Sequence, residues 1–82
     1  MKDELVQLAT KFEEVFTKYM GFISVGCTIV NQEWMPEVFI TKETFLTEFP
    51  DEDFNYEILS ENYYKMYIDY KGVRFYCHTS DM

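Results

Sequence analysis

The sequence predicts a single α+β domain in which a long N-terminal amphipathic helix packs on an antiparallel sheet of four or five strands. Two patterns of apolar residues lead to this prediction. Apolar residues recur at helical spacing over residues 1–20, and from Phe22 onward they alternate with polar residues at the period of two that is typical of strands. The 82 residues leave room for one hydrophobic core, so we expect a single domain, 1–82.

The first segment has the signals of a helix at both ends. Asp3 and Glu4 lie in the expected first turn, where the helix dipole favours anions, and Gly21 follows as a stop. Charged residues fall largely between the apolar ones, which indicates a helix with one face on a core. The apolar positions at helical spacing are Leu5, Leu8, Ala9, Phe12, Val15, Phe16 and Tyr19.

Two strands and a short helix are expected next. Alternation predicts a strand from Phe22 that directs Ile23, Val25, Cys27 and Ile29 toward the core, followed by a turn at residues 31–33. A second strand, interrupted by Pro36, continues the inward set with Trp34, Val38 and Ile40. Residues 41–49 are expected to form a short helix between the second and third strands, because Thr41 can cap it and Phe45 and Phe49 stack one turn apart.

The end of the chain predicts a third strand over residues 54–59 and then a hairpin. A two-residue turn at Lys71-Gly72 places the strongly apolar residues on one face and a compatible polar and aromatic set on the other. The expected inward pairs are Tyr70 with Val73, Ile68 with Phe75 and Met66 with Cys77, and the expected outward pairs are Asp69 with Arg74, Tyr67 with Tyr76 and Lys65 with His78.

No catalytic, metal or cofactor site is expected from these residues. The single histidine, His78, follows Cys77 on a strand, so the two side chains should face opposite sides of the sheet. Residues 51–57 resemble the start of a calcium-binding EF-hand loop, but Tyr56 replaces its glycine and Asn62 its final glutamate. The three glycines form no phosphate cradle, so an enzyme is the least supported class.

The distribution of charge provides the functional lead. The formal charge is −8, and residues 43–64 contain seven acids and no lysine or arginine. The other residues hold eight acids and seven bases, so they are nearly neutral. This segment is either a solvated surface or a binding surface for a basic partner. In the second case Asp53, Glu57 and Glu61, spaced along a strand, would imitate a phosphate backbone.

Aromatic residues could anchor such a contact. Tyr67 and Tyr76 are the best exposed candidates, because the predicted register places both on the outward face. We therefore expect no catalytic residue and a partner-binding surface made of Glu43, Glu48, Asp51, Glu52, Asp53, Glu57, Glu61, Tyr67 and Tyr76.

In size, charge and element order the chain resembles small acidic inhibitor proteins encoded by bacteriophages. The resemblance covers the amphipathic helix, the segment TKETFLTEFP and the hairpin YYKMYIDYKGVRFYC. Among such proteins, anti-CRISPR and other anti-defence inhibitors often occupy a nucleic-acid-binding site with carboxylates. The resemblance implies a non-enzymatic inhibitor that acts as a nucleic-acid mimic.

The expected partner is a basic nucleic-acid-handling protein such as a nuclease, with no direct nucleic-acid or membrane contact and a possible homodimer. Two alternatives remain. One is a module that dimerises or docks a host protein through an aromatic sheet face, and the other is an immunity-type protein against a basic toxin nuclease. Residues 1–20 lack the features of a secretory signal, which predicts a cytoplasmic protein with Cys27 and Cys77 reduced.

Overall fold

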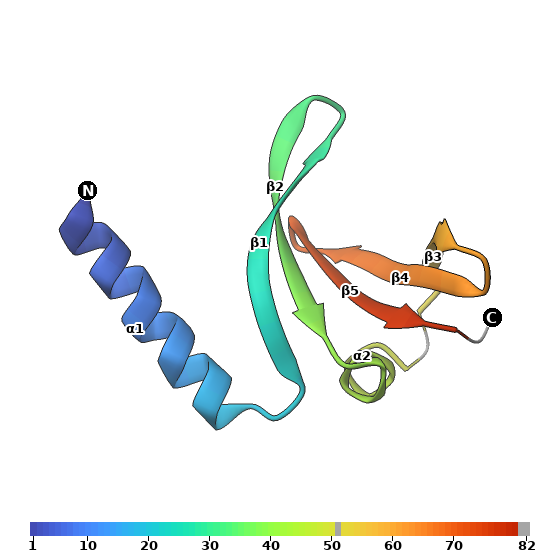
Figure 1. Cartoon of the computed structure of the whole chain (residues 1–82), viewed down its shortest axis with the longest axis horizontal. Helices are drawn as coiled ribbons and strands as arrows, with labels where there is room; N and C mark the ends of the chain where they lie inside the picture. The colour runs from blue at the N-terminus through green and yellow to red at the C-terminus, as the bar shows by residue number, and fades with distance from the viewer. Residues whose placement is uncertain (51, 81–82) are drawn as a thin grey trace.

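The computed structural model describes residues 1–50 and 52–80, and it confirms the α+β class. A long helix and a two-stranded hairpin are followed by a short helix and three more strands (Figure 1). The strands form one five-stranded sheet. The elements are α1 (Lys2–Lys18), β1 (Phe22–Val30), β2 (Glu33–Ile40), α2 (Lys42–Glu48), β3 (Asn55–Ser60), β4 (Tyr63–Tyr70) and β5 (Val73–Thr79).

The sheet is mixed, so the prediction of a wholly antiparallel sheet was wrong in one pair. The strand order is β1-β2-β5-β4-β3, and β5 lies between β2 and β4. It pairs antiparallel with β4 but parallel with β2, with Val38 opposite Phe75. The alternation of apolar residues reports which face a side chain takes, and it carries no information on which distant strand will be its neighbour.

The C-terminal hairpin has the register that the sequence predicts. Met66 is opposite Cys77, Tyr67 opposite Tyr76 and Asp69 opposite Arg74. The turn residues Lys71 and Gly72 have φ values of 51° and 81°, as a two-residue type I′ turn requires. A tight turn between alternating strands therefore fixed this register from local sequence alone.

The core lies between α2 and one face of the sheet. Phe45 is fully buried, and Phe49 packs one helical turn away with ring centroids 5.5 Å apart. The Thr41 hydroxyl accepts a hydrogen bond from the Thr44 backbone N–H at 3.2 Å, which caps the helix. The buried apolar residues of the described chain are Ile40, Phe45, Phe49, Met66 and Cys77.

α1 contacts the sheet but covers less of it than the sequence predicts. No residue of α1 is buried, and the helix runs beside β1 at one end of the molecule (Figure 1). Its ring contact with the sheet is Phe12 against Phe22, with centroids 5.4 Å apart. The shorter helix α2, through Phe45 and Phe49, fills the core face that α1 was expected to cover.

The inward set predicted for β1 is exposed for the same reason. Val25 pairs with Val38, which packs against the core, so the predicted face is correct. However, Val25 and Ile29 remain exposed because neither α1 nor α2 covers that part of the sheet. Ile23, at a register shift between Phe22 and Ser24, is also exposed. Cys27, expected to point into a core, is likewise exposed.

Candidate functional site

The predicted acidic residues divide into separate groups in the structure. Glu43 and Glu48 lie on α2, Glu52 and Asp53 follow it, and all four are exposed. Asp51 lies outside the described residues. In residues 1–50 and 52–80, no ion pair involves any of the six described acids of this segment, namely Glu43, Glu48, Glu52, Asp53, Glu57 and Glu61.

The expected row of acids along one strand is not formed. β3 begins at Asn55 and ends at Ser60, so Asp53 precedes the strand and Glu61 lies in the turn after it. A register shift between Ile58 and Ser60 further breaks the alternation. Glu57 alone of the three lies within β3, opposite Lys65 on β4.

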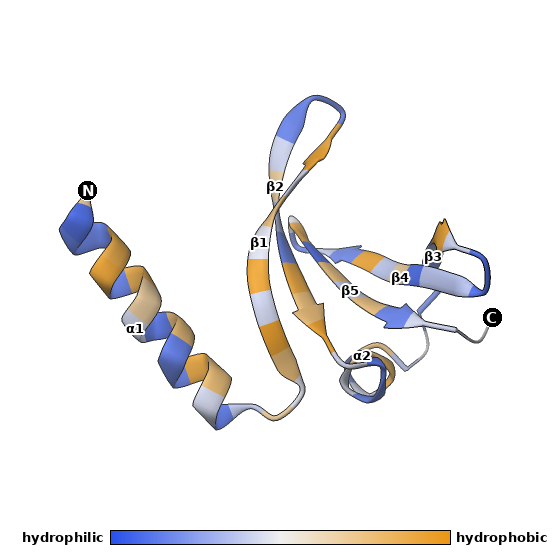
Figure 2. Cartoon of the chain, viewed as in Figure 1, coloured by the Kyte–Doolittle hydropathy of each residue, from blue (hydrophilic) through white to orange (hydrophobic). Residues whose placement is uncertain are grey.

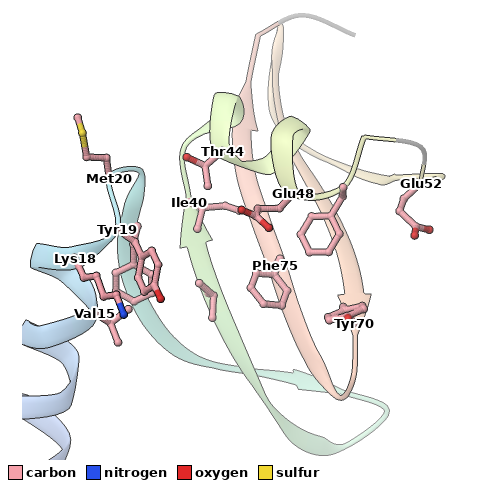
Figure 3. Close-up of a pocket in the computed structure, with 13 residues that line it drawn as sticks. Val15, Lys18, Tyr19, Met20, Ile40, Thr44, Glu48, Glu52, Tyr70 and Phe75 are labelled. Carbon is pink, nitrogen blue, oxygen red and sulfur yellow. The ribbon is translucent and has the colours of Figure 1, made fainter.

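A groove of about 750 Å³ adjoins Glu48 of α2 and Glu52 after it (Figure 3). Apolar side chains form most of its wall. Val15 of α1 and Tyr19, which follows the helix, face Ile40 and Phe75 of the sheet across it. The remaining apolar lining residues are Met20, Phe22, Val38, Phe49 and Tyr70. Concave apolar surfaces of this size are typical of binding sites.

The bend after α1 creates the groove. Gly21 adopts φ +91°, and its carbonyl oxygen accepts a hydrogen bond from the Thr41 N–H at 2.9 Å. This bond ties the start of β1 to the start of α2 and holds the end of α1 across from that helix. An added Cβ at Gly21 would collide with the Thr44 hydroxyl. Both the positive φ and this close contact favour glycine at the position.

Carboxylates dominate the rim of the groove. Glu48 and Glu52 lie on the side formed by α2 and the segment after it, and Thr44 supplies a hydroxyl. Lys18 is the one cation among the lining residues described, and its ammonium lies 5.3 Å from the centre of the Tyr19 ring. An apolar groove with a mainly acidic rim suits a ligand that combines an apolar side chain with flanking positive charges.

Tyr67 and Tyr76, also predicted as binding residues, lie on the opposite face of the sheet from α2. Both are half-buried rather than fully exposed, since Arg74 lies 4.2 Å above the Tyr67 ring and Lys65 lies 4.4 Å above the Tyr76 ring. Burial, together with repulsion from Glu37, raises the pKa of Tyr76.

Ion pairs neutralise the cations on this second face. Lys65 donates to Glu37 at 2.7 Å in a largely buried pair, and Arg74 donates to Asp69 at 2.7 Å. These contacts hold the tyrosines in a network internal to the sheet. The structure therefore brings Glu57, Tyr67 and Tyr76 to one face, and it separates them from Glu43, Glu48 and Glu52.

Cys77 and His78 face opposite sides of the sheet, as the sequence predicts. Cys77 is fully buried, and burial raises the pKa of its thiol, which disfavours the reactive thiolate. His78 Nδ1 lies 3.0 Å from the Tyr63 hydroxyl on the other face. Within residues 1–50 and 52–80 no three His, Cys, Asp or Glu side chains group as metal ligands, and no helix is long and apolar enough to span a membrane.

The groove was not visible in the sequence. Its lining residues have the spacing of ordinary core residues, and Phe49 and Phe75 do belong to the core or its margin. They line an open groove because Gly21 directs α1 away from the sheet, and a single glycine gives no sign of the direction in which the chain turns.

Comparison of the chain with protein-family models, with curated proteins and with solved structures finds no match.

Proposed function

We propose that this protein is a non-enzymatic inhibitor that binds a basic nucleic-acid-binding surface of a partner protein, with its carboxylates in place of phosphates. The observation that supports the proposal is the set of exposed carboxylates between Glu43 and Glu61 that have no ion-pair partner in the described chain. By contrast, Glu37 and Asp69, outside this segment, are each neutralised by a cation of the same sheet, Lys65 and Arg74. The unpaired acids remain available for an external cation.

The groove would make binding specific for one basic partner over others. A long-range attraction between acidic and basic surfaces accelerates encounter but discriminates poorly between basic partners. Glu48 and Glu52 lie beside an apolar groove, so a partner can insert an apolar side chain while neighbouring lysines or arginines meet the carboxylates. The interaction would then combine electrostatic steering with a desolvated anchor.

Capture of partners at two salt concentrations tests the proposal. The immobilised chain is incubated with bacterial lysate at about 50 mM and about 500 mM salt, and the captured proteins are identified. We expect a basic nucleic-acid-handling protein that is retained at low salt, released at high salt and displaced by added duplex DNA. If that protein is a toxin nuclease, the chain is an immunity-type inhibitor with the same mechanism.

Matched charge reversals locate the surface. The variant with Glu48→Lys and Glu52→Lys should bind the captured protein about tenfold more weakly for each reversed charge. The control with Glu13→Lys and Glu33→Lys changes the net charge equally at exposed acids outside the acidic segment, and its affinity should be nearly unchanged. Equal losses in both variants, or binding that does not respond to salt, would contradict the proposal.

A further inference from the structure

The molecule exposes more surface than a compact chain of its size. Its accessible surface is 6,507 Å², whereas a compact monomer of 9.9 kDa exposes about 5,200 Å². The radius of gyration is 14.0 Å, against about 12 Å for a compact chain of 82 residues. The excess of about 1,300 Å² is larger than the area of about 800 Å² that one partner contributes to a stable interface.

Part of this excess is the apolar face of α1. Leu8 is 61% exposed, and Leu5 and Phe16 on the same side of the helix are exposed to a similar degree. Phe16 stacks on Phe12, and Phe12 contacts Phe22 of β1. This contact with the sheet lies in the C-terminal half of the helix. An amphipathic helix normally buries its apolar face in a folded protein. The N-terminal half of that face in α1 is not packed against the rest of the protomer.

The other part is the outer half of the β1–β2 hairpin. Val25, Ile29 and Trp34 lie on the face that continues from Val38 and the core, and Figure 2 shows apolar positions along both α1 and β1. Ile29 is 60% exposed and the directly opposed Trp34 is 74% exposed. A cross-strand pair of this kind is normally covered by a second layer.

We propose that a second copy of this chain covers this surface, with α1 of each protomer packed on the outer β1–β2 face of the other. The chain carries both halves of a helix-on-sheet layer, each unpartnered within the protomer, and a two-fold axis pairs each half with its complement. The lengths agree, because the 17 residues of α1 span about 25 Å and the nine residues of β1 about 30 Å.

The charge distribution also favours a second copy at this place. Two chains of charge −8 repel each other, but α1 carries four acids and three bases and is nearly neutral. The surplus acids of residues 43–64 lie on α2, on β3 and near them, outside the proposed interface. The acidic rim of the groove at Glu48 and Glu52 thus remains free, so this dimer does not depend on the proposed inhibitory function.

Complementary substitutions test the dimer. Light scattering on a sizing column should give the wild-type chain twice its mass of 9.9 kDa. Leu8→Lys and Ile29→Glu each place a charge in the interface and should yield monomers, while an equimolar mixture should recover the dimeric mass because the lysine then faces the glutamate. Leu46→Lys, at an exposed leucine of α2 outside the interface, is the matched control and should stay dimeric.

Trp34 provides an independent readout, since it is the one tryptophan of the chain. Its emission should shift to the red in the Leu8→Lys monomer, because the ring becomes exposed, while circular dichroism shows that the helix and strands persist. A wild-type chain that stays at 9.9 kDa up to about 1 mM overturns the proposal. A dimer that survives both single substitutions, or that Leu46→Lys disrupts equally, also overturns it.

Discussion

At the residue scale, Gly21 determines where α1 lies. Its φ of +91° is disfavoured for any residue with a side chain, and a Cβ would strike the Thr44 hydroxyl. We expect Gly21→Ala to lower the free energy of unfolding by about 1–3 kcal/mol. The helical content should change little, because α1 and α2 each retain their own hydrogen bonds.

Gly26→Ala is the matched control, because Gly26 has no neighbouring atom within reach of an added Cβ and no positive φ. That variant should be unchanged or more stable by up to about 1 kcal/mol, as its unfolded chain has less conformational freedom. Urea unfolding of the two variants measures the difference. Equal stabilities would mean that the bend at Gly21 is not constrained by Thr44.

Asp69 gives the stability a defined dependence on pH. Hydrogen bonds from Arg74 lower the pKa of this carboxyl below its ordinary value of 3.8, although burial opposes the shift. A lowered folded-state pKa means that the pair stabilises the fold above pH 3.8 and that this contribution is lost as the pH falls through the folded-state pKa. The Asp69 side chain is 42% exposed, so the contribution is less than about 1 kcal/mol.

Carboxyl-detected NMR titration checks the sign of this effect. The Asp69 midpoint should lie below 3.8 in the wild-type chain and rise toward that value in Arg74→Gln. A midpoint for Asp69 that Arg74→Gln leaves unmoved would contradict the assigned cause.

At the element scale, α2 supplies the centre of the core. Phe45 is fully buried and contacts Phe49 and Phe54, with ring centroids 5.5 and 4.9 Å away. Phe45→Ala should therefore cost about 3–5 kcal/mol, enough to unfold a small domain with few buried residues. The adjacent Leu46 is 41% exposed on the same helix, so Leu46→Ala should change stability by no more than about 0.5 kcal/mol. Thermal melts of the two variants, with a Tm that falls in Phe45→Ala alone, test the assignment.

The elements also show which parts of the fold the sequence could predict. The register of β4 and β5 followed from the Lys71-Gly72 turn and the alternation around it, because both signals are local. The parallel pairing of β2 with β5 and the position of α1 were not predictable in this way. They depend on contacts between distant segments, Val38 with Phe75 and Gly21 with Thr41, which leave no periodic pattern.

At the scale of the whole molecule, the candidate site was predictable in part. The surplus of acids between Glu43 and Glu61 is a property of the sequence and needs no fold to be seen. Which residues lie beside those acids depends on the fold. Glu48 and Glu52 border a groove, and Glu57 lies on the opposite face of the sheet with Tyr67. A linear charge map cannot separate the two faces of a sheet.

The central place of β5 determines the order in which the chain can fold. The β1–β2, β3–β4 and β4–β5 pairs are local hairpins, and hairpins form in about 1–10 μs in isolated peptides. These local pairs do not complete the sheet, because β5 must also pair with the distant β2 and align Val38 with Phe75. Closing so long a loop costs entropy before any contact compensates it, so the pairing of β2 with β5 is the slow step of folding. Until that step, the strand edges of β2 and β5 are unpaired and open to aggregation.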